Sequence, residues 1–314
     1  MPWTTLTFMT SMLAYQGALA AGPTIPKPYY ELSEPELSAR LAAIRREPLR
    51  RRLDMVSAGF LGAPYKIHPL GEGPDARFDR GPLHDFQAFD CTTYIEQVMA
   101  LAIEPRLPAA LGILRKIRYR NGTARYGERN HFPEADWIPN NIRAGFLIDV
   151  TARLAGPATR EATKTISKRR WYAGKTEQDL HGFEKAPPSD IDSKLAALRA
   201  LGQDIPDGPA SLPYLPLSRF AALESLIPSG TIANLVREDD PNAPTLVTHQ
   251  GFLIRKDGAL YFRHASERLG RVVDEKAGAY FASYAKSRRK LLGINLLEVA
   301  RGPSSRSPGV GAAP

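Results

Sequence analysis

The sequence predicts an α+β fold in which helices come first and a sheet occupies the last third of the chain. Before residue 120, apolar side chains recur at the three- and four-residue spacing of a helix face. After residue 230, runs rich in β-branched residues are bounded by turn residues, as strands are. Strands that follow helices, instead of alternating with them, favour the α+β class.

The composition is that of a globular protein. Among 314 residues, 43% are hydrophobic and 24% are charged, which excludes a wholly disordered chain and a collagen-like fibre. The single cysteine, Cys91, excludes an internal disulfide. Lys and Arg outnumber Asp and Glu by 42 to 33, but their clusters neither alternate with aromatic residues nor match a nucleic-acid-binding motif. We therefore expect solvated helix faces and no nucleic-acid partner.

The N-terminal segment resembles a secretory signal. Residues 1–26 carry no charge, and the mildly apolar run 6–20 ends in Ala18-Leu19-Ala20, a small-residue cleavage site. We expect residues 1–20 to be a signal peptide and the protein to be exported, to the periplasm. Basic residues are missing from the first positions, so an unstructured cytosolic N-terminus stays open as an alternative. The run is too short and too polar for a transmembrane anchor.

The C-terminal residues have a different composition. Residues 302–314 are mostly Gly, Pro, Ser and Ala, which predicts a disordered tail. No internal repeat is visible in the chain. The remaining residues, 21–301, are predicted to form a single domain with a helical insertion.

The first elements are marked by their boundaries. A Ser-x-x-Glu capping box begins a predicted helix over residues 33–46. A second helix, over 48–60, ends at the break Gly62-Ala63-Pro64-Tyr65. Residues 66–89 are rich in Gly and Pro and show no sustained period, so they are predicted to be a loop.

Helices continue through the middle of the chain. One begins after Asp90 and stops before Pro105, and another is predicted over 108–118. After an irregular segment, residues 155–226 are predicted to be mostly helical, with breaks at four prolines. Strands are predicted afterwards, over residues 231–236, 246–254 and 260–263, with a turn at 256–258.

Cys91 is the first candidate catalytic residue. It lies in the first turn of the helix behind Asp90, where unpaired backbone N–H groups and the helix dipole favour a thiolate. A lone cysteine is more often a small buried hydrophobic residue. One unpaired cysteine at a helix start in an exported protein instead indicates a catalytic nucleophile.

Two histidines supply the candidate base and its partner, which a cysteine nucleophile requires. His249 and His264 flank the hairpin turn Lys256-Asp257-Gly258. In an antiparallel hairpin with an even loop, both side chains fall on one face, opposite or nearly so. The other four histidines are interpreted as loop or surface residues. No His-x-x-x-His or Cys-x-x-Cys spacing indicates a metal site, and no cofactor is predicted.

Several short motifs then connect these residues to a known family. Along the chain they are Gly62-Ala63-Pro64-Tyr65, Phe89-Asp90-Cys91-Thr92-Thr93, Thr248-His249-Gln250-Gly251-Phe252 and Arg263-His264-Ala265-Ser266. In this order they resemble the motifs of the NlpC-type bacterial cell-wall cysteine hydrolases. The closer resemblance is to a branch once classified as a domain of unknown function and associated with N-acetylmuramoyl-L-alanine amidase activity. It extends over residues 55–275.

The resemblance implies a fold and a set of roles. The fold would be papain-like, with the cysteine opening a helix that packs on a small antiparallel sheet carrying the base. Cys91 would be the nucleophile, His249 the general base and then acid, and His264 the residue that orients His249. Tyr65 would stand beside the oxyanion. Asp90 would receive a free peptide amine, as in endopeptidase relatives, or serve only as the helix cap.

Two arginines and the choice of substrate complete the interpretation. Arg118 and Arg129 lie in segments expected to be irregular chain near the cleft, where they would bind carboxylates of D-Glu or diaminopimelate; surface salt bridges are equally compatible. The predicted function is cleavage of the amide between N-acetylmuramic acid and L-alanine in peptidoglycan or its fragments. Two alternatives stay open: an endopeptidase acting between D-Glu and diaminopimelate, and a cell-wall-binding protein without catalysis.

Overall fold

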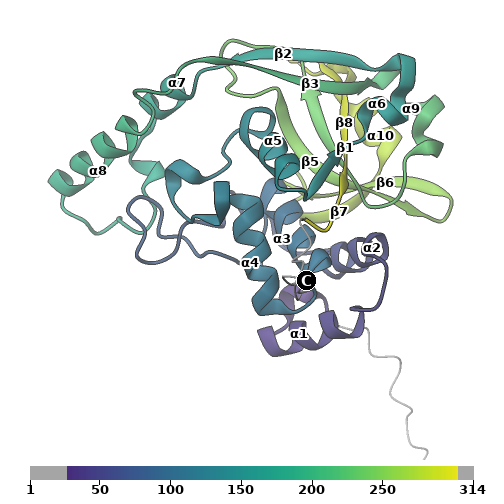
Figure 1. Ribbon diagram of the computed structural model, residues 1–314, viewed down its shortest axis with the longest axis horizontal. Helices are drawn as coiled ribbons and strands as arrows, with labels where there is room; N and C mark the ends of the chain where they lie inside the picture. The colour runs from purple at the N-terminus through teal and green to yellow at the C-terminus, as the bar shows by residue number, and fades with distance from the viewer. Residues whose placement is uncertain (1–26, 303–314) are drawn as a thin grey trace, which may run out of the picture.

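The computed structural model describes residues 27–302 (Figure 1). Its helices are α1 (Glu34–Ala43), α2 (Leu49–Gly59), α3 (Cys91–Ile103), α4 (Leu107–Arg118), α5 (Ile138–Arg143), α6 (Thr151–Ala155), α7 (Lys168–Ala173), α8 (Pro188–Ala200), α9 (Leu217–Leu223) and α10 (Ala277–Ala282). Its strands are β1 (Leu147–Asp149), β2 (Arg160–Ile166), β3 (Gly208–Pro216), β4 (Thr231–Arg237), β5 (Val247–Lys256), β6 (Ala259–Ser266), β7 (Arg271–Lys276) and β8 (Leu291–Val299). The predicted signal peptide and nearly all of the predicted tail lie outside the described residues.

The strands form one antiparallel sheet. Their order is β2-β3-β8-β4-β5-β6-β7, and β1 pairs with β8 beside this path. The central strands are apolar and almost fully buried, as β4 and β8 show, because helices cover both of their faces. The α+β prediction is therefore confirmed.

Each face of the sheet has its own hydrophobic core. One core lies between the sheet and α1 to α5 and includes Val98 of α3 and Phe252 of β5. The other includes Leu253 of β5 and Tyr280 of α10. Successive side chains of a strand point to opposite faces, so Phe252 and Leu253 enter different cores. Figure 1 shows α1 to α4 gathered on one side of the sheet, with α7 and α8 extending away from it.

The helices predicted before residue 120 are confirmed within a few residues of their ends. α1 begins with the predicted capping box, in which the Ser33 backbone N–H donates to the Glu36 carboxylate at 2.8 Å. α2 and α4 match the predictions over 48–60 and 108–118. The segment 66–89 contains no helix or strand, only isolated bridges to its neighbours.

The mostly helical interpretation of residues 155–226 is wrong in part, because β2 and β3 lie within it and pair along their lengths. β2 does alternate between exposed and buried positions, but its buried side carries Ala162, Lys164 and Ile166, a weak apolar signal. β3 contains Pro209 and Pro213, which lack a backbone N–H and normally indicate a break in a sheet.

The hairpin predicted in the last third is confirmed. β5 and β6 pair from Phe252 with Arg263 to Lys256 with Ala259. Asp257 and Gly258 form a two-residue turn with φ of 50° and 77°. Positive φ at both positions is the geometry that matches the twist of paired strands, and it suits Asp-Gly. β7 and β8 extend the sheet beyond the strands that the sequence predicted.

Candidate active site

Cys91 and its cap are held by a reciprocal set of hydrogen bonds at the start of α3. Cys91 is the first residue of the helix, and Asp90 is its N-cap. The Asp90 carboxylate accepts from the Thr93 backbone N–H at 2.7 Å, and the Asp90 N–H donates to the Thr93 hydroxyl at 3.0 Å. The second carboxylate oxygen accepts from the His68 N–H at 3.2 Å. Asp90 thus occupies the capping role.

The expected thiolate at this helix start is not what the surroundings favour. Cys91 is only partly exposed, and burial of its thiol together with the negative charge of Asp90 raises the thiol pKa to about 12. Hydrogen bonds from Thr92 and from the Gln250 backbone oppose this rise but do not offset it. The resting nucleophile is therefore a thiol, and it needs a base to remove its proton.

The hairpin brings His249 and His264 together as predicted. Because Phe252 pairs with Arg263, the same register sets His264 opposite Gly251, two positions from His249 on the same face. The two imidazoles are joined by a hydrogen bond of 2.7 Å between His249 Nε2 and His264 Nδ1. The His249 ring thus has Nδ1 as its remaining nitrogen for a substrate or a nucleophile.

Glu275 continues this chain of side chains and was not singled out from the sequence. It lies on β7, next to β6, and its Oε2 is 3.0 Å from His264 Nε2. Its other oxygen accepts from Arg268 at 2.7 Å. The sequence held one usable signal, because a third strand beside the hairpin must place side chains against His264, but β7 itself was not predicted.

Aromatic rings surround the two histidines. Phe262 stacks on His264 with 4.7 Å between ring centroids, and Tyr280 lies 4.8 Å from His264 by the same measure. Burial lowers the pKa of His249 to about 3 and that of His264 to about 4, helped by nearby positive charge. Both imidazoles are therefore neutral at neutral pH, the state a general base requires.

The Cys91 thiol lies close to the backbone of Gln250, the strand residue that follows His249. The Gln250 backbone lowers the pKa of the Cys91 thiol, against the larger opposing effects of burial and of Asp90. Within residues 27–302, no direct hydrogen bond joins the thiol to His249. The thiol also contributes to the raised pKa of Tyr65 and of Tyr280, after burial as the larger cause for each. Tyr65, and the Tyr280 ring that packs on His264, therefore both lie close enough to the Cys91 thiol to respond to its charge.

Tyr65 is positioned by the chain segment next to Cys91. Its backbone forms a bridge with Phe89, two residues before Cys91, and its N–H donates to the Gly270 carbonyl at 2.8 Å. Tyr65 therefore connects the start of α3 with the turn that follows β6. This placement makes its hydroxyl available near the thiol.

A buried row of amides supports the strand behind Cys91. The Gln250 amide donates to Asn234 at 2.7 Å, and Asn234 donates to Asn295 at 2.9 Å across three neighbouring strands. Asn295 then donates to Asp149 at 2.8 Å. The sequence assigns no role to Gln250. Its side chain faces away from His249, yet its hydrogen bond to Asn234 fixes the strand that carries His249.

The structure places both predicted substrate arginines in internal ion pairs. Arg118 ends α4, instead of lying in irregular chain, and donates to the buried Glu96 of α3 at 2.8 Å and to the Leu70 carbonyl at 2.9 Å. Arg129 contacts Glu72 and also Asp79, the latter at 2.7 Å. Both guanidinium groups thus neutralise carboxylates of their own chain, and neither is carried into the proposed site.

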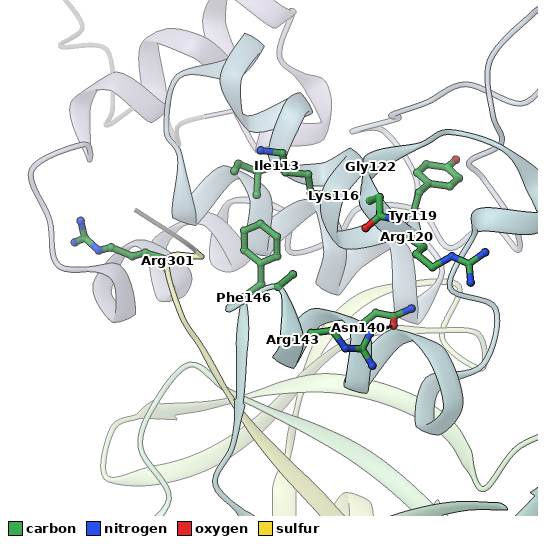
Figure 2. Close-up of a pocket in the computed structure, with 11 residues that line it drawn as sticks. Ile113, Lys116, Tyr119, Arg120, Gly122, Asn140, Arg143, Phe146 and Arg301 are labelled. Atoms are coloured by element: carbon green, nitrogen blue, oxygen red, sulfur yellow. Dashed lines mark hydrogen bonds between the residues drawn. The ribbon is translucent and has the colours of Figure 1, made fainter. Parts of the chain in front are cut away.

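Five cavities of the described residues have linings without Cys91, His249 or His264. A cavity of about 470 Å³ lies beside α4 and α5 (Figure 2). Its lining includes Lys116, Arg120, Arg143 and Arg301, but Arg120 pairs with Glu128. In Figure 2 Arg120 and Arg301 lie at opposite ends of the cavity, so its cations do not converge on one point.

Neither a metal cluster nor a membrane-spanning helix is found in the described part of the chain. Within residues 27–302, no three side chains of His, Cys, Asp or Glu come together as a metal site. Over the same residues, none of the helices has the length and apolarity needed to cross a bilayer.

Solved structures with this fold include peptidoglycan amidases. A Legionella pneumophila protein from a domain family of unknown function aligns with a TM-score of 0.80 and 29% identity, over 85% of this chain and 94% of that one. An N-acetylmuramoyl-L-alanine amidase from Bacteroides uniformis aligns with a TM-score of 0.59 and 25% identity, over 80% of this chain and 99% of that one. A Bacteroides fragilis protein with a provisional xylanase name gives 0.56 and 26%, over 78% and 100%.

Fold and neighbours together define an amidase-like peptidoglycan hydrolase. The profile of the AmiA-like family, described as N-acetylmuramoyl-L-alanine amidase-like, matches residues 55–289. The chain belongs to this family. No curated protein sequence gives a significant match.

Proposed function

We propose that this protein is a cysteine amidase that cleaves the bond between N-acetylmuramic acid and L-alanine in peptidoglycan or its fragments. The observation that carries the proposal is the bonded pair His249 and His264 on the hairpin, with Cys91 at the start of α3, the helix that contacts both hairpin strands β5 and β6. A helix that presents a cysteine to a sheet carrying its base is the arrangement of papain-like hydrolases, and we place this fold among them. Family membership supports the choice of substrate.

The mechanism begins with general-base catalysis. The thiol of Cys91 has a raised pKa and His249 is neutral, so Nδ1 of His249 takes the thiol proton as the sulfur attacks the lactyl carbonyl of muramic acid. The carbonyl π-bond opens to a tetrahedral oxyanion. Tyr65 and the backbone N–H of Cys91 are the donors placed to stabilise it.

The second half of the reaction returns the enzyme to its starting state. Protonated His249 gives its proton to the amide nitrogen as the C–N bond breaks, so the stem peptide leaves with a free amine on L-alanine. A thioester on Cys91 remains. His249 then takes a proton from a water molecule as its oxygen attacks the thioester. The C–S bond breaks, the sugar leaves as its free acid, and the Cys91 thiolate takes the proton back from His249.

The predicted export supports access to this substrate, because peptidoglycan lies outside the cytoplasm. We propose a periplasmic location on the basis of residues 1–20. Secretion of a fusion of these residues to a reporter enzyme would test that location. Retention of the fusion in the cytoplasm would contradict it.

The bond that is cleaved can be decided by weighing products. A defined muropeptide with MurNAc, L-Ala, D-Glu and diaminopimelate is incubated with the protein, and the products are separated and identified by mass spectrometry. The amidase releases an intact stem peptide that begins with L-alanine. Release of a fragment that begins with diaminopimelate would instead support an endopeptidase.

A wall-binding protein without catalysis predicts a different pair of results. It would bind muropeptide, and a thiol-directed reagent would fail to label Cys91. We expect labelling of Cys91 and turnover of the muropeptide, because the nucleophile, the base and the orienting histidine are all present.

A glycosidase function, which the provisional name of the Bacteroides fragilis neighbour would suggest, has less support. Glycosidases use two carboxyl groups that flank the scissile bond. Of the carboxylates at this site, Asp90 caps a helix and Glu275 is paired with Arg268.

A further inference from the structure

The side chains His249, His264 and Glu275 form a continuous line of hydrogen bonds, here called the relay. Its links are 2.7 Å from His249 Nε2 to His264 Nδ1 and 3.0 Å from His264 Nε2 to Glu275 Oε2. Each neutral imidazole has one N–H and one lone pair, so each ring can be placed in the relay in two ways. Which way it is placed decides whether His249 can act as a base.

Glu275 removes this ambiguity. A carboxylate can only accept hydrogen bonds, and the other oxygen of Glu275 accepts from Arg268 at 2.7 Å. His264 Nε2 must therefore carry the proton, which leaves a lone pair on His264 Nδ1. That lone pair must accept from His249, so His249 Nε2 carries the second proton. The lone pair of His249 is then on Nδ1, the nitrogen left for the Cys91 proton.

We propose that Glu275 is a fourth member of the site, a positioning residue that sets the tautomers of both histidines from the far end of the relay. The proposal rests on the proposed function for its catalytic meaning, but the tautomers themselves are a property of the resting protein. Without the carboxylate the reversed arrangement becomes possible, in which His249 Nδ1 carries a proton and cannot accept one from Cys91.

The surroundings of the relay favour this arrangement. His264 has a side chain only 2% exposed, whereas Glu275 is 23% exposed at the other end of their bond. The rings of Phe262 and Tyr280 pack against His264 and limit its rotation. The relay thus passes from a solvent-accessible ion pair through a fixed buried ring to the base, and the Glu275 charge also stabilises the imidazolium formed during the reaction.

Arg268 makes the proposal unusually testable, because it holds the second oxygen of Glu275. In Glu275→Gln, Arg268 keeps the amide oxygen and the amide NH₂ is turned towards His264. His264 Nε2 must then accept, which reverses both tautomers. We expect kcat to fall by roughly 10³-fold, as happens when an orienting carboxylate is replaced by its amide.

The double variant Glu275→Gln with Arg268→Met should be more active than Glu275→Gln alone. Without Arg268, the amide is free to turn its oxygen to His264 and to restore the original tautomers. We expect a recovery of at least about tenfold in kcat over Glu275→Gln alone. Arg268→Met alone should keep the wild-type tautomers, because the Glu275 carboxylate still only accepts from His264. A residue with a merely structural role would give a double variant no better than the single one.

The direct readout is ¹⁵N NMR of the histidine rings, recorded on the full protein without substrate. The proposal expects His249 to be protonated at Nε2 in the wild type and at Nδ1 in Glu275→Gln. Glu275→Leu, which offers neither donor nor acceptor, should give both tautomers and serves if the glutamine variant folds poorly. Glu298→Gln is the matched control, because Glu298 is also a strand glutamate paired with exposed arginines.

The outcomes separate the two proposals. Unchanged tautomers in both Glu275→Gln and Glu275→Leu, or equal activity of the single and double variants, would overturn the role of Glu275. If the wild type cleaves no muropeptide while the tautomers still reverse, the proposed function fails and the relay stands.

Discussion

Two polar networks of the protein, the relay and a set of buried arginine ion pairs, differ in how they end. In the relay, hydrogen bonds run from Glu275 through His264 to His249 and stop at a ring nitrogen that has no partner assigned to it within the described chain. In the arginine network, Arg118 and Arg129 face carboxylates of the same chain on several sides. The first network leaves one end open for chemistry, whereas the second is neutralised internally and can only hold the structure together.

The largest expected effect comes from removing His249, the residue at the open end of the relay. His249→Asn should lower kcat for muropeptide cleavage by roughly 10³-fold while the melting temperature changes little, because the thiol loses its base. Product formation followed by chromatography measures the loss. His84→Asn is the control, since His84 pairs with the exposed Glu34, packs beside Phe86 and lies outside the relay. Comparable losses in the two variants would contradict the assignment of His249.

The next largest effect comes from breaking an ion pair of the arginine network. Glu96→Gln leaves the Arg118 charge uncompensated in a side chain that is 7% exposed, which should lower the free energy of unfolding by about 3–5 kcal/mol. Urea denaturation measures this change. The exposed pair of Arg120 and Glu128 is the control, and Glu128→Gln should cost less than about 1 kcal/mol. Equal costs would show that burial does not separate the two pairs.

How much the sequence predicts differs between these two networks. Cys91 and the histidine pair follow from local rules, a helix cap and the alternation of a hairpin, so their placement could be predicted. The partners of Arg118 and Arg129 are Glu96, Glu72 and Asp79, which come from other segments. No local pattern connects a residue with a partner 22 to 57 positions away, so the sequence did not reveal that these arginines pair within the chain.

The fold shows the same division. Helices with a strong apolar face and the Asp-Gly hairpin were predicted, because their signals lie within a few residues. β2 and β3 were missed because their local signals are mixed. The buried side of β2 includes Ala162 and Lys164, and β3 contains Pro209 and Pro213. Glu275 was missed for the related reason that β7 has one buried residue, Val272, and four charged side chains among its six.

Acid should lower the free energy of unfolding by protonating the two histidines of the relay. The pKa of His249 is lowered to about 3 and that of His264 to about 4, so the unfolded chain binds more protons than the folded one between these values and the usual histidine pKa near 6.5. The free energy of unfolding should therefore be constant above about pH 7 and fall as the pH drops towards 4. Replacing both histidines by Asn should flatten this part of the curve; an unchanged slope would contradict the shifts.

The smallest effect concerns the charge beside the nucleophile. Asp90→Asn keeps a good helix cap but removes the negative charge that raises the Cys91 pKa. The thiol pKa should fall, and alkylation by iodoacetamide at pH 8 should become several-fold faster, roughly 3- to 10-fold for a shift of half a unit to one unit. The melting temperature should change little. Slower alkylation would mean that Asp90 does not act on the thiol through its charge.

The central claim is that Cys91 cleaves the muramoyl amide, and one comparison tests it most directly. Wild-type protein and Cys91→Ala are incubated with the same MurNAc-tripeptide, and the products are weighed. The wild type should release free MurNAc and an intact peptide beginning with L-alanine, while Cys91→Ala, folded to the same extent, should release neither. Cleavage of the muramoyl bond by Cys91→Ala at the wild-type rate would contradict the account.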